Sequence, residues 1–266
     1  MLEKWRLIKD GPAEGAWNMA VDHALLHAAE DGATAPVLRF YSWARPTLSI
    51  GRLQKGDGVD LDYLASEGIP MVRRPTGGRA LLHDHELTYS VTLPAGARLY
   101  GSLDEVYTRI NIALVRALAS HGIRPDRHDD SDGRGYSISD ACFATRLGHE
   151  ISVDGRKVAA GAQRRLKRSA MQHGSILLTA DVERSMRCLI WPDPRQRHRA
   201  GNAMAGLCDL TGHHIGADQV SNSVIGAFAE LYQIEYETTS LSLEEEEAAR
   251  MIITRRDEST RYAGAF

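Results

Sequence analysis

The spacing of apolar residues along the chain predicts both helices and strands. Apolar residues recur every three to four positions in five segments, which is the period of one buried helix face. Helices are therefore expected over 15–30, 60–67, 102–122, 218–231 and 242–255. The pairs Ser102 with Glu105 and Ser242 with Glu245 have the spacing of a capping box, which starts a helix.

Other segments have the pattern of β-strands. Apolar and polar residues alternate strictly over 87–93, which predicts a strand with one face buried and one face in water. Further strands are expected over 38–43, 48–51, 150–153, 156–160 and 175–178. Asp154 and Gly155 between two of them tolerate the positive φ of a tight turn, so a β-hairpin is expected there.

The order of these elements indicates the fold class. Strands and helices follow one another without a regular β-α-β alternation, which favours an α+β fold with a mixed, largely antiparallel sheet flanked by helices. No repeat and no Gly- or Pro-rich linker interrupts the chain. We expect one domain over 1–240 and a C-terminal helical tail over 241–266.

Composition and charge exclude several classes of protein. The 266 residues carry 32 Lys plus Arg against 35 Asp plus Glu, and this net charge of −3 argues against a strongly basic nucleic-acid binder. Residues 1–10 alternate charged and apolar positions and lack the apolar core of a signal peptide, and nowhere do about 18 apolar residues follow one another. The odd set of Cys142, Cys188 and Cys208, with no Cys-x-x-Cys pair, indicates a reducing compartment. A cytoplasmic protein is therefore expected.

One segment between two predicted strands has the residues of a ligand-binding loop. It reads Arg73-Arg74-Pro75-Thr76-Gly77-Gly78-Arg79 and continues to His83. Adjacent glycines let the backbone approach a ligand, and the arginines can hold a carboxylate or phosphate. An ordinary surface loop is the alternative. The segment is not a phosphate-binding loop of the Gly-Lys-Ser/Thr type, and its His and Asp residues do not form a metal-ligand cluster, so no metal is expected.

A second segment offers a nucleophile and a cation. Cys142 precedes the predicted hairpin, and Lys157 lies on its return strand. An ammonium near a thiol stabilises the attacking thiolate, so the two form a nucleophile and acid/base pair if the fold brings them together. The alternative is that Cys142 is a small buried apolar residue. Seven Lys or Arg against two acids over 146–168 indicate a face for an acidic partner, or else a solvated strand and loop.

Both segments resemble those of a known family. RRPTGGRALLHDHELTYSV over 73–91, CFATRLGHEISVDGRKVAAGAQRR over 142–165 and QHGSILL over 172–178 resemble the motifs of the biotin/lipoate protein ligase superfamily. The TGGRA loop and the Cys-Phe pair before the GRK hairpin are most similar to the octanoyltransferases of lipoate synthesis in Gram-positive bacteria. The likeness spans about 2–231 and implies the catalytic-domain fold of that superfamily.

The resemblance also implies a reaction and its participants. An octanoyl group would move from octanoyl-acyl carrier protein to a lysine of a lipoyl domain, in a 2-oxoacid dehydrogenase or the glycine cleavage H protein. Cys142 would carry the acyl group and Lys157 would lower its pKa. Substrate-binding residues would be Arg73, Arg74, Thr76, Gly77, Gly78, Arg79, His83, Gly161 and His173. No metal, nucleotide, nucleic acid or membrane enters this scheme, and a monomer is expected.

Other activities remain open within the same superfamily. Another octanoyltransferase branch has its nucleophile later in the chain, where Cys208 is the candidate. An ATP-dependent lipoate-protein ligase, an amidotransferase that moves lipoyl or octanoyl groups between proteins, and a non-catalytic lipoyl-domain binder are the alternatives to the octanoyltransferase.

Overall fold

The computed structural model describes residues 1–126 and 150–262, with side chains as far as residue 255. The strands are β1 (Glu3–Ala13), β2 (Val37–Trp43), β3 (Thr47–Ile50), β4 (Met71–Arg73), β5 (Leu81–His83), β6 (Glu86–Pro94), β7 (Ile151–Val153), β8 (Arg156–Arg165), β9 (Ser169–Leu177) and β10 (Ile234–Thr238). The helices are α1 (Gly15–Glu30), α2 (Leu61–Ser66), α3 (Leu103–Ala119), α4 (Val182–Arg187), α5 (Pro194–Gly201), α6 (Leu207–Thr211), α7 (Ala217–Tyr232) and α8 (Leu243–Tyr262).

Two sheets organise the described part of the chain. The larger has the order β10-β1-β2-β6-β9-β8-β7, and the smaller has the order β4-β3-β5. In the larger sheet β1 runs parallel to both of its neighbours, whereas every other pair is antiparallel. This arrangement confirms the predicted α+β class with a mixed, largely antiparallel sheet.

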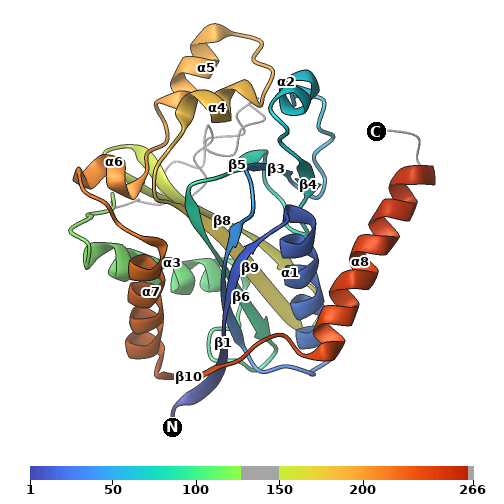
Figure 1. The fold of residues 1–266 in the computed structure, drawn as a ribbon. Helices are drawn as coiled ribbons and strands as arrows, with labels where there is room; N and C mark the ends of the chain where they lie inside the picture. Colours follow the sequence, from blue (N-terminus) through green and yellow to red (C-terminus); the bar gives the residue numbers. More distant parts are fainter. Residues whose placement is uncertain (127–149, 263–266) are drawn as a thin grey trace.

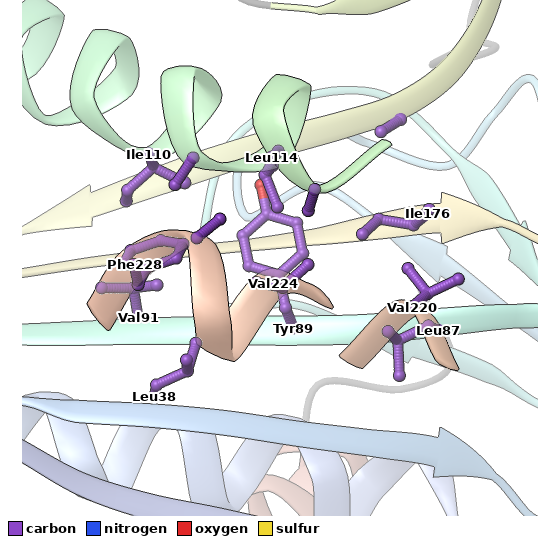
Figure 2. Close-up of a cluster of buried hydrophobic side chains, with 14 of the residues drawn as sticks. Leu38, Leu87, Tyr89, Val91, Ile110, Leu114, Ile176, Val220, Val224 and Phe228 are labelled. Carbon is purple, nitrogen blue, oxygen red and sulfur yellow. The ribbon is translucent and has the colours of Figure 1, made fainter. Parts of the chain in front are cut away.

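Helices α3 and α7 cover one face of the larger sheet and form the main core with it (Figures 1 and 2). The alternating residues Leu87, Tyr89 and Val91 of β6 point into this layer. The two helices present apolar faces to them, and the larger buried side chains of those faces include Val106, Ile110, Leu114, Val220, Val224 and Phe228. Burying this apolar surface holds helices and sheet together.

The structure shows that one expectation about β6 was wrong. The alternation over 87–93 predicted a strand with one solvated face, but every residue of β6 except Pro94 is buried. Helix α1 packs on the face opposite α3 and α7, so the polar positions Thr88, Ser90 and Thr92 are also removed from water. Thr88 finds partners there, because its hydroxyl accepts a hydrogen bond from Trp43 Nε1 at 2.9 Å and donates to Glu86.

The C-terminal helix α8 lies against α1 (Figure 1). Ala249 is fully buried against Ala20, Val21 and Ala24 of α1. Glu245 of α8 accepts hydrogen bonds from the guanidinium of Arg6 on β1 and is itself buried. The division of the chain into a domain over 1–240 and a tail over 241–266 stays a prediction, and the observed helix is attached to the rest by apolar and ionic contacts.

The local predictions at turns and helix starts are confirmed. Ser102 and Glu105 form a capping box at α3, and Ser242 and Glu245 exchange the same two hydrogen bonds at α8. Asp154 and Gly155 form the β7–β8 turn with φ of 50° and 74°. Strands β1, β4, β5 and β10 and the short helices α4, α5 and α6 were not predicted. None of the helices in the described ranges is long and apolar enough to span a membrane.

Candidate active site

A cavity of about 390 Å³ opens between the small sheet, α1 and the β8–β9 pair, a volume in the usual range of small-molecule sites. Residues from α1, β2, the 74–83 segment, β6, α3, β8 and β9 meet around it, together with Glu150. Of the residues expected from the sequence, those that line it are Arg74, Gly77, Gly78, Arg79, His83, Gly161 and His173. Met19 of α1 and Tyr41 of β2 complete an otherwise largely apolar wall.

Two glycines without side chains form part of the cavity floor. Gly161 of β8 and Gly174 of β9 are paired directly across the two strands. A Cβ added to Gly174 would lie 2.3 Å from the carbonyl oxygen of Ala160 and 2.7 Å from the hydroxyl of Tyr89. At Gly161 the added Cβ would lie 2.9 Å from the same hydroxyl. Tyr89 thus occupies the room that two side chains would need, on the core side of the sheet.

Arg73 and Arg74, expected to hold substrate, have guanidinium groups bonded to the protein backbone. Arg73 Nη1 donates to the carbonyl oxygens of Gly51 and Gln54 at 2.8 and 2.6 Å, and Arg73 is absent from the cavity lining. Arg74 Nε donates to Gly77 O at 3.0 Å and Nη2 donates to Arg79 O at 2.7 Å. Arg74 therefore shapes the glycine loop that lines the cavity, whereas Arg73 holds the 51–54 segment.

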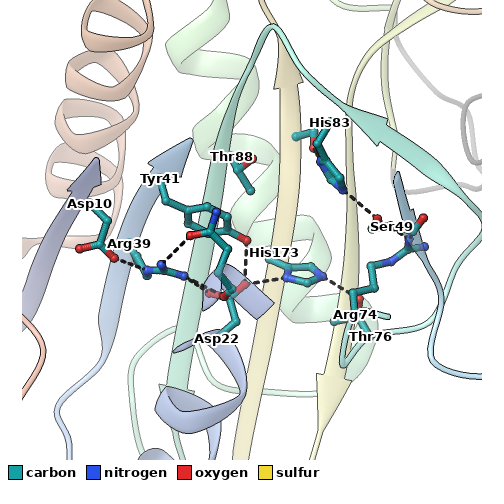
Figure 3. A network of polar contacts seen from close by, with 12 residues as sticks. Asp10, Asp22, Arg39, Tyr41, Ser49, Arg74, Thr76, His83, Thr88 and His173 are labelled. Carbon is teal, nitrogen blue, oxygen red and sulfur yellow. Dashed lines mark hydrogen bonds and ion pairs between the residues drawn. The ribbon is translucent and has the colours of Figure 1, made fainter. Parts of the chain in front are cut away.

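Thr76 is fully buried behind the loop and contacts another expected site residue (Figure 3). Its Oγ1 lies 2.7 Å from His173 Nε2, and His173 Nδ1 lies 2.8 Å from Asp22 Oδ2. An ionised carboxylate has no proton to donate, so Nδ1 of His173 donates to Asp22. In the tautomer whose single ring proton is on Nδ1, Nε2 accepts from the Thr76 hydroxyl. The structure brings Thr76 and His173 together, as two parts of one hydrogen-bonded chain.

Asp22 is buried together with an arginine that neutralises it (Figure 3). Arg39 donates to Asp22 Oδ1 at 2.7 Å and to Asp10 Oδ2 at 2.7 Å, and the Tyr41 hydroxyl donates to Asp22 Oδ2 at 2.8 Å. Burial by itself raises the pKa of Asp22. The hydrogen bond from His173 and the charge of Arg39 outweigh burial, so the pKa of this carboxyl lies below its ordinary value.

A second carboxylate–histidine pair stands on the opposite side of the loop. His83 Nδ1 donates to Glu86 Oε1 at 2.8 Å, and His83 Nε2 lies 2.8 Å from the Ser49 hydroxyl. Arg74 in turn donates to this hydroxyl at 3.0 Å. Burial by itself raises the pKa of Glu86. The interaction with His83 and the hydrogen bonds from Ser175 and Thr88 outweigh burial, so the pKa of Glu86 lies below its ordinary value.

Lys157, the expected acid/base residue, is buried and bonded to a glutamate at the cavity wall. Its Nζ donates to Glu150 Oε1 at 2.5 Å, and the exposed fractions of the two side chains are 2% and 6%. The Lys157 backbone is fixed by hydrogen bonds with Ala203 and Ala205. Glu150 lines the cavity, so this ion pair is in a position to act on a bound molecule.

The predicted nucleophile Cys142 lies outside the described residues, in the segment that ends just before Glu150. The alternative nucleophile Cys208 lies on α6, packs at the edge of the main core and accepts a hydrogen bond from the Ile215 amide. It is absent from the cavity lining. Burial raises the pKa of the third thiol, Cys188, to about 12, so it is protonated at neutral pH. In the described ranges no group of three or more His, Cys, Asp or Glu forms a metal site.

The basic segment over 146–168 does not form one continuous surface in the described residues. Lys157 is buried, and adjacent strand positions point to opposite faces of β8. Arg164 contacts the carbonyl oxygen of Pro75 beside the glycine loop, whereas Arg165 donates to Gly101 O and lies over the Tyr100 ring. Only part of this charge lies near the cavity.

Sequence reasoning missed several polar residues of the site. Asp22 lies in a predicted helix and Arg39 in a predicted strand, and neither was singled out as a site residue. Glu150, one of the two acids in the basic segment over 146–168, was not expected in the site either. A charged residue within an otherwise apolar run could have indicated a buried ion pair. A charge that is buried with such a run requires a partner of opposite charge.

The chain is similar in sequence to known proteins. Residues 14–229 match the lipoyl protein ligase A/B catalytic domain. The protein Octanoyltransferase LipM of Kyrpidia tusciae is 38% identical over 96% of both chains. The protein of the same name from Carboxydothermus hydrogenoformans is 36% identical, again over 96% of both chains.

Solved structures show the same fold. A bi-partite lipoate protein ligase from Thermoplasma acidophilum superposes with a TM-score of 0.77 at 24% identity, over 96% of this chain and 93% of that one. A lipoate-protein ligase A bound with ATP gives a TM-score of 0.77 at 24% identity, over 96% and 95% of the two chains. The catalytic-domain fold expected from the motifs is thus confirmed, and the chain belongs to the lipoyl protein ligase A/B catalytic domain family, alongside the LipM octanoyltransferases.

Proposed function

We propose that this octanoyltransferase of lipoate biosynthesis works through a thioester on Cys142, with octanoyl-acyl carrier protein as donor and a lipoyl-domain lysine as acceptor. Relatives that cover nearly the whole chain are octanoyltransferases, so the chain is an acyltransferase. The observation that carries the proposed mechanism is the buried Lys157–Glu150 pair at the wall of a largely apolar cavity.

The cavity suits a medium-length acyl chain. Met19, Tyr41 and Ala160 offer apolar surface to the hydrocarbon. Gly77 and Gly78 line the cavity, and among the described residues neither of their amides has a hydrogen-bond acceptor. Such amides can bind the oxyanion that forms when a thioester carbonyl is attacked.

The first half-reaction loads the enzyme. The Cys142 thiolate attacks the thioester carbonyl of the donor, a new carbon–sulfur bond to Cys142 forms, and the bond to the carrier thiol breaks. The carrier thiolate takes a proton as it leaves. The ammonium of Lys157 stabilises the Cys142 thiolate beforehand and supplies that proton.

The second half-reaction transfers the acyl group to the acceptor lysine. The uncharged amine attacks the Cys142 thioester, an amide bond forms, and the Cys142 thiolate is released. The nitrogen loses one proton in this step. The Lys157–Glu150 pair accepts it and returns to its starting state, so the cycle needs no metal and no nucleotide.

The scheme requires an acceptor domain and an acidic donor protein. The acceptor would be a lipoyl domain of a 2-oxoacid dehydrogenase or the glycine cleavage H protein. Arg164, near the glycine loop, is placed to attract an acidic carrier protein. We further propose a monomer that acts in the cytoplasm and binds neither nucleic acid nor membrane.

Intact-protein mass spectrometry after mixing with octanoyl-acyl carrier protein tests the proposal. The wild type should gain one octanoyl group, the Cys142→Ala variant should gain none, and the Cys208→Ala control should gain it at the normal rate. An octanoyl group that persists in Cys142→Ala contradicts the thioester. Lipoylation that requires ATP and free lipoate, with full activity in Cys142→Ala, would instead show a ligase.

Replacing Met19 with Ala should shift the acyl-chain preference towards longer chains. Met19 is 1% exposed and lines the cavity, so truncation creates room that additional methylene groups can fill. One methylene in an apolar pocket changes a substrate preference by about 10-fold or more. The ratio of kcat/KM for decanoyl over octanoyl donors measures the shift. An unchanged ratio would show that the chain end lies elsewhere, and Leu26→Ala, at an equally buried α1 position outside the lining, is the control.

A further inference from the structure

A chain of hydrogen bonds connects the buried interior of the protein to the glycine loop (Figure 3). It runs from Asp10 through Arg39 and Asp22 to His173 and ends at Thr76. Arg39, Asp22 and Thr76 are completely buried, and His173 is 5% exposed. The chain therefore joins α1, β1, β2 and β9 to a loop that has no regular secondary structure of its own.

Asp22 determines the direction of the last hydrogen bond in this chain. Its charge holds the His173 proton on Nδ1, which leaves Nε2 as an acceptor for the Thr76 hydroxyl. The loss of that charge would allow His173 to place its proton on either nitrogen. A residue that fixes the tautomer of a neighbouring histidine in this way also fixes the orientation of its ring.

The rest of the loop is held by its carbonyl oxygens. Thr76 O accepts from the Arg52 amide at 2.8 Å, and Arg74 donates to the carbonyl oxygens of Gly77 and Arg79. The carbonyl oxygen of Gly78 lies against Gly51 so closely that a Cβ there would approach it to 2.0 Å. Three of these carbonyls are bonded to donors of the protein, and among the described residues the Gly77 and Gly78 amides have no acceptor, so the two amides remain for a ligand.

We propose that Asp22 is a positioning residue for acyl transfer: through His173 and Thr76 it holds the Gly77 and Gly78 amides where they bind the oxyanion. The inference rests on the proposed octanoyl transfer and adds a group that does not touch the substrate. Thr76 connects the two parts, because its hydroxyl is hydrogen-bonded to His173 and its backbone directly precedes the two glycines.

Three variants separate this role from a general effect on folding. Thr76→Val keeps the shape of the side chain and removes the hydroxyl, whereas Thr76→Ser keeps the hydroxyl. Asp22→Asn keeps the size of the carboxyl and removes its charge. Thr92→Val is the matched control, because Thr92 is an equally buried threonine on β6 that takes no part in the chain of hydrogen bonds.

The experiment follows hydrogen exchange in a peptide spanning 74–83 and, in parallel, the rate of octanoyl uptake from octanoyl-acyl carrier protein. Thr76→Val should raise exchange of the loop amides about tenfold, because one buried hydrogen bond that restrains the loop is lost. Octanoyl uptake should slow by about 10- to 100-fold, with most of the loss in kcat rather than KM. Asp22→Asn should change both in the same direction, Thr76→Ser should restore both, and Thr92→Val should change neither.

Unchanged loop exchange in Thr76→Val would overturn the proposal, as would a Thr76→Ser variant that behaves like Thr76→Val. If Asp22→Asn does not fold, the comparison of Thr76→Val with Thr76→Ser still tests whether the Thr76 hydroxyl holds the loop. Wild-type protein that takes up no octanoyl group would overturn the proposed function. In that case the exchange measurements still decide whether the hydrogen-bonded chain holds the loop.

Discussion

Replacing Lys157 with Met should slow octanoyl uptake by about 100- to 10,000-fold, the range expected for a positioned acid/base group. The side chain of Met is apolar and has nearly the length of the four-carbon aliphatic part of the Lys side chain. The change therefore mainly removes the ammonium. Without it, the Cys142 thiol loses the cation proposed to stabilise its thiolate and the proton donor for the departing carrier thiol. Mass spectrometry of the acyl-enzyme over time measures the rate.

The Lys157→Met change also leaves Glu150 buried without its cation. Breaking a buried ion pair by removing one partner costs about 3–5 kcal/mol of stability, so slow uptake alone would be ambiguous. The double variant Lys157→Met with Glu150→Gln removes both charges and should recover most of that stability without recovering the rate. Recovery of the rate in the double variant would show that Lys157 has only a structural role.

Replacing Arg39 with Met should lower the free energy of unfolding by about 3–5 kcal/mol. Arg39 is fully buried between Asp10 and Asp22 and lies 4.1 Å from the centre of the Tyr41 ring. Its removal leaves the charge of Asp22 without a cation in the interior. Urea denaturation at neutral pH measures the loss, and the double variant Arg39→Met with Asp22→Asn should lose less than the single variant.

The same variant should depend on pH in a defined direction. In the wild type the pKa of Asp22 lies below its ordinary value of 3.8, so its contribution to stability is present above that pH and is lost as pH falls through the folded pKa. Without Arg39, burial becomes the dominant influence and the pKa of Asp22 rises. The stability deficit of Arg39→Met should therefore shrink as pH is lowered from neutral, and a deficit that grows would contradict the assignment.

Elements with a strong local pattern could be predicted from the sequence. Helix 15–30, the capping box at Ser102 and the turn at Asp154 depend on neighbours in the chain, and the structure has all three. The alternation over residues 1–10 was used only to exclude a signal peptide, although it also fits a strand. Its partner β10 follows more than 200 residues later, a pairing that no local pattern reports.

Site residues that belong to a glycine pair or to a recognised motif could be predicted from the sequence. Residues whose role depends on burial and on contacts between distant elements could not. Gly77, Gly78 and His173 do line the cavity. The guanidinium of Arg74 is instead bonded to Ser49 and to loop carbonyls, because the fold brings those acceptors within hydrogen-bonding distance. The part played by Asp22 depends on contacts with β2 and β9, which exist only after the sheet has formed.

The glycine pair in the cavity floor links the cavity to the core on the other side of the sheet. Tyr89 fills the space over Gly161 and Gly174 from the core, so only strand backbone separates the Tyr89 ring from the cavity at this point. Helix α3 also reaches the cavity directly, because Tyr107 is one of its lining residues. A substitution in the layer formed by α3 and α7 is therefore expected to change the shape of the proposed acyl site, even where the substituted residue does not line it.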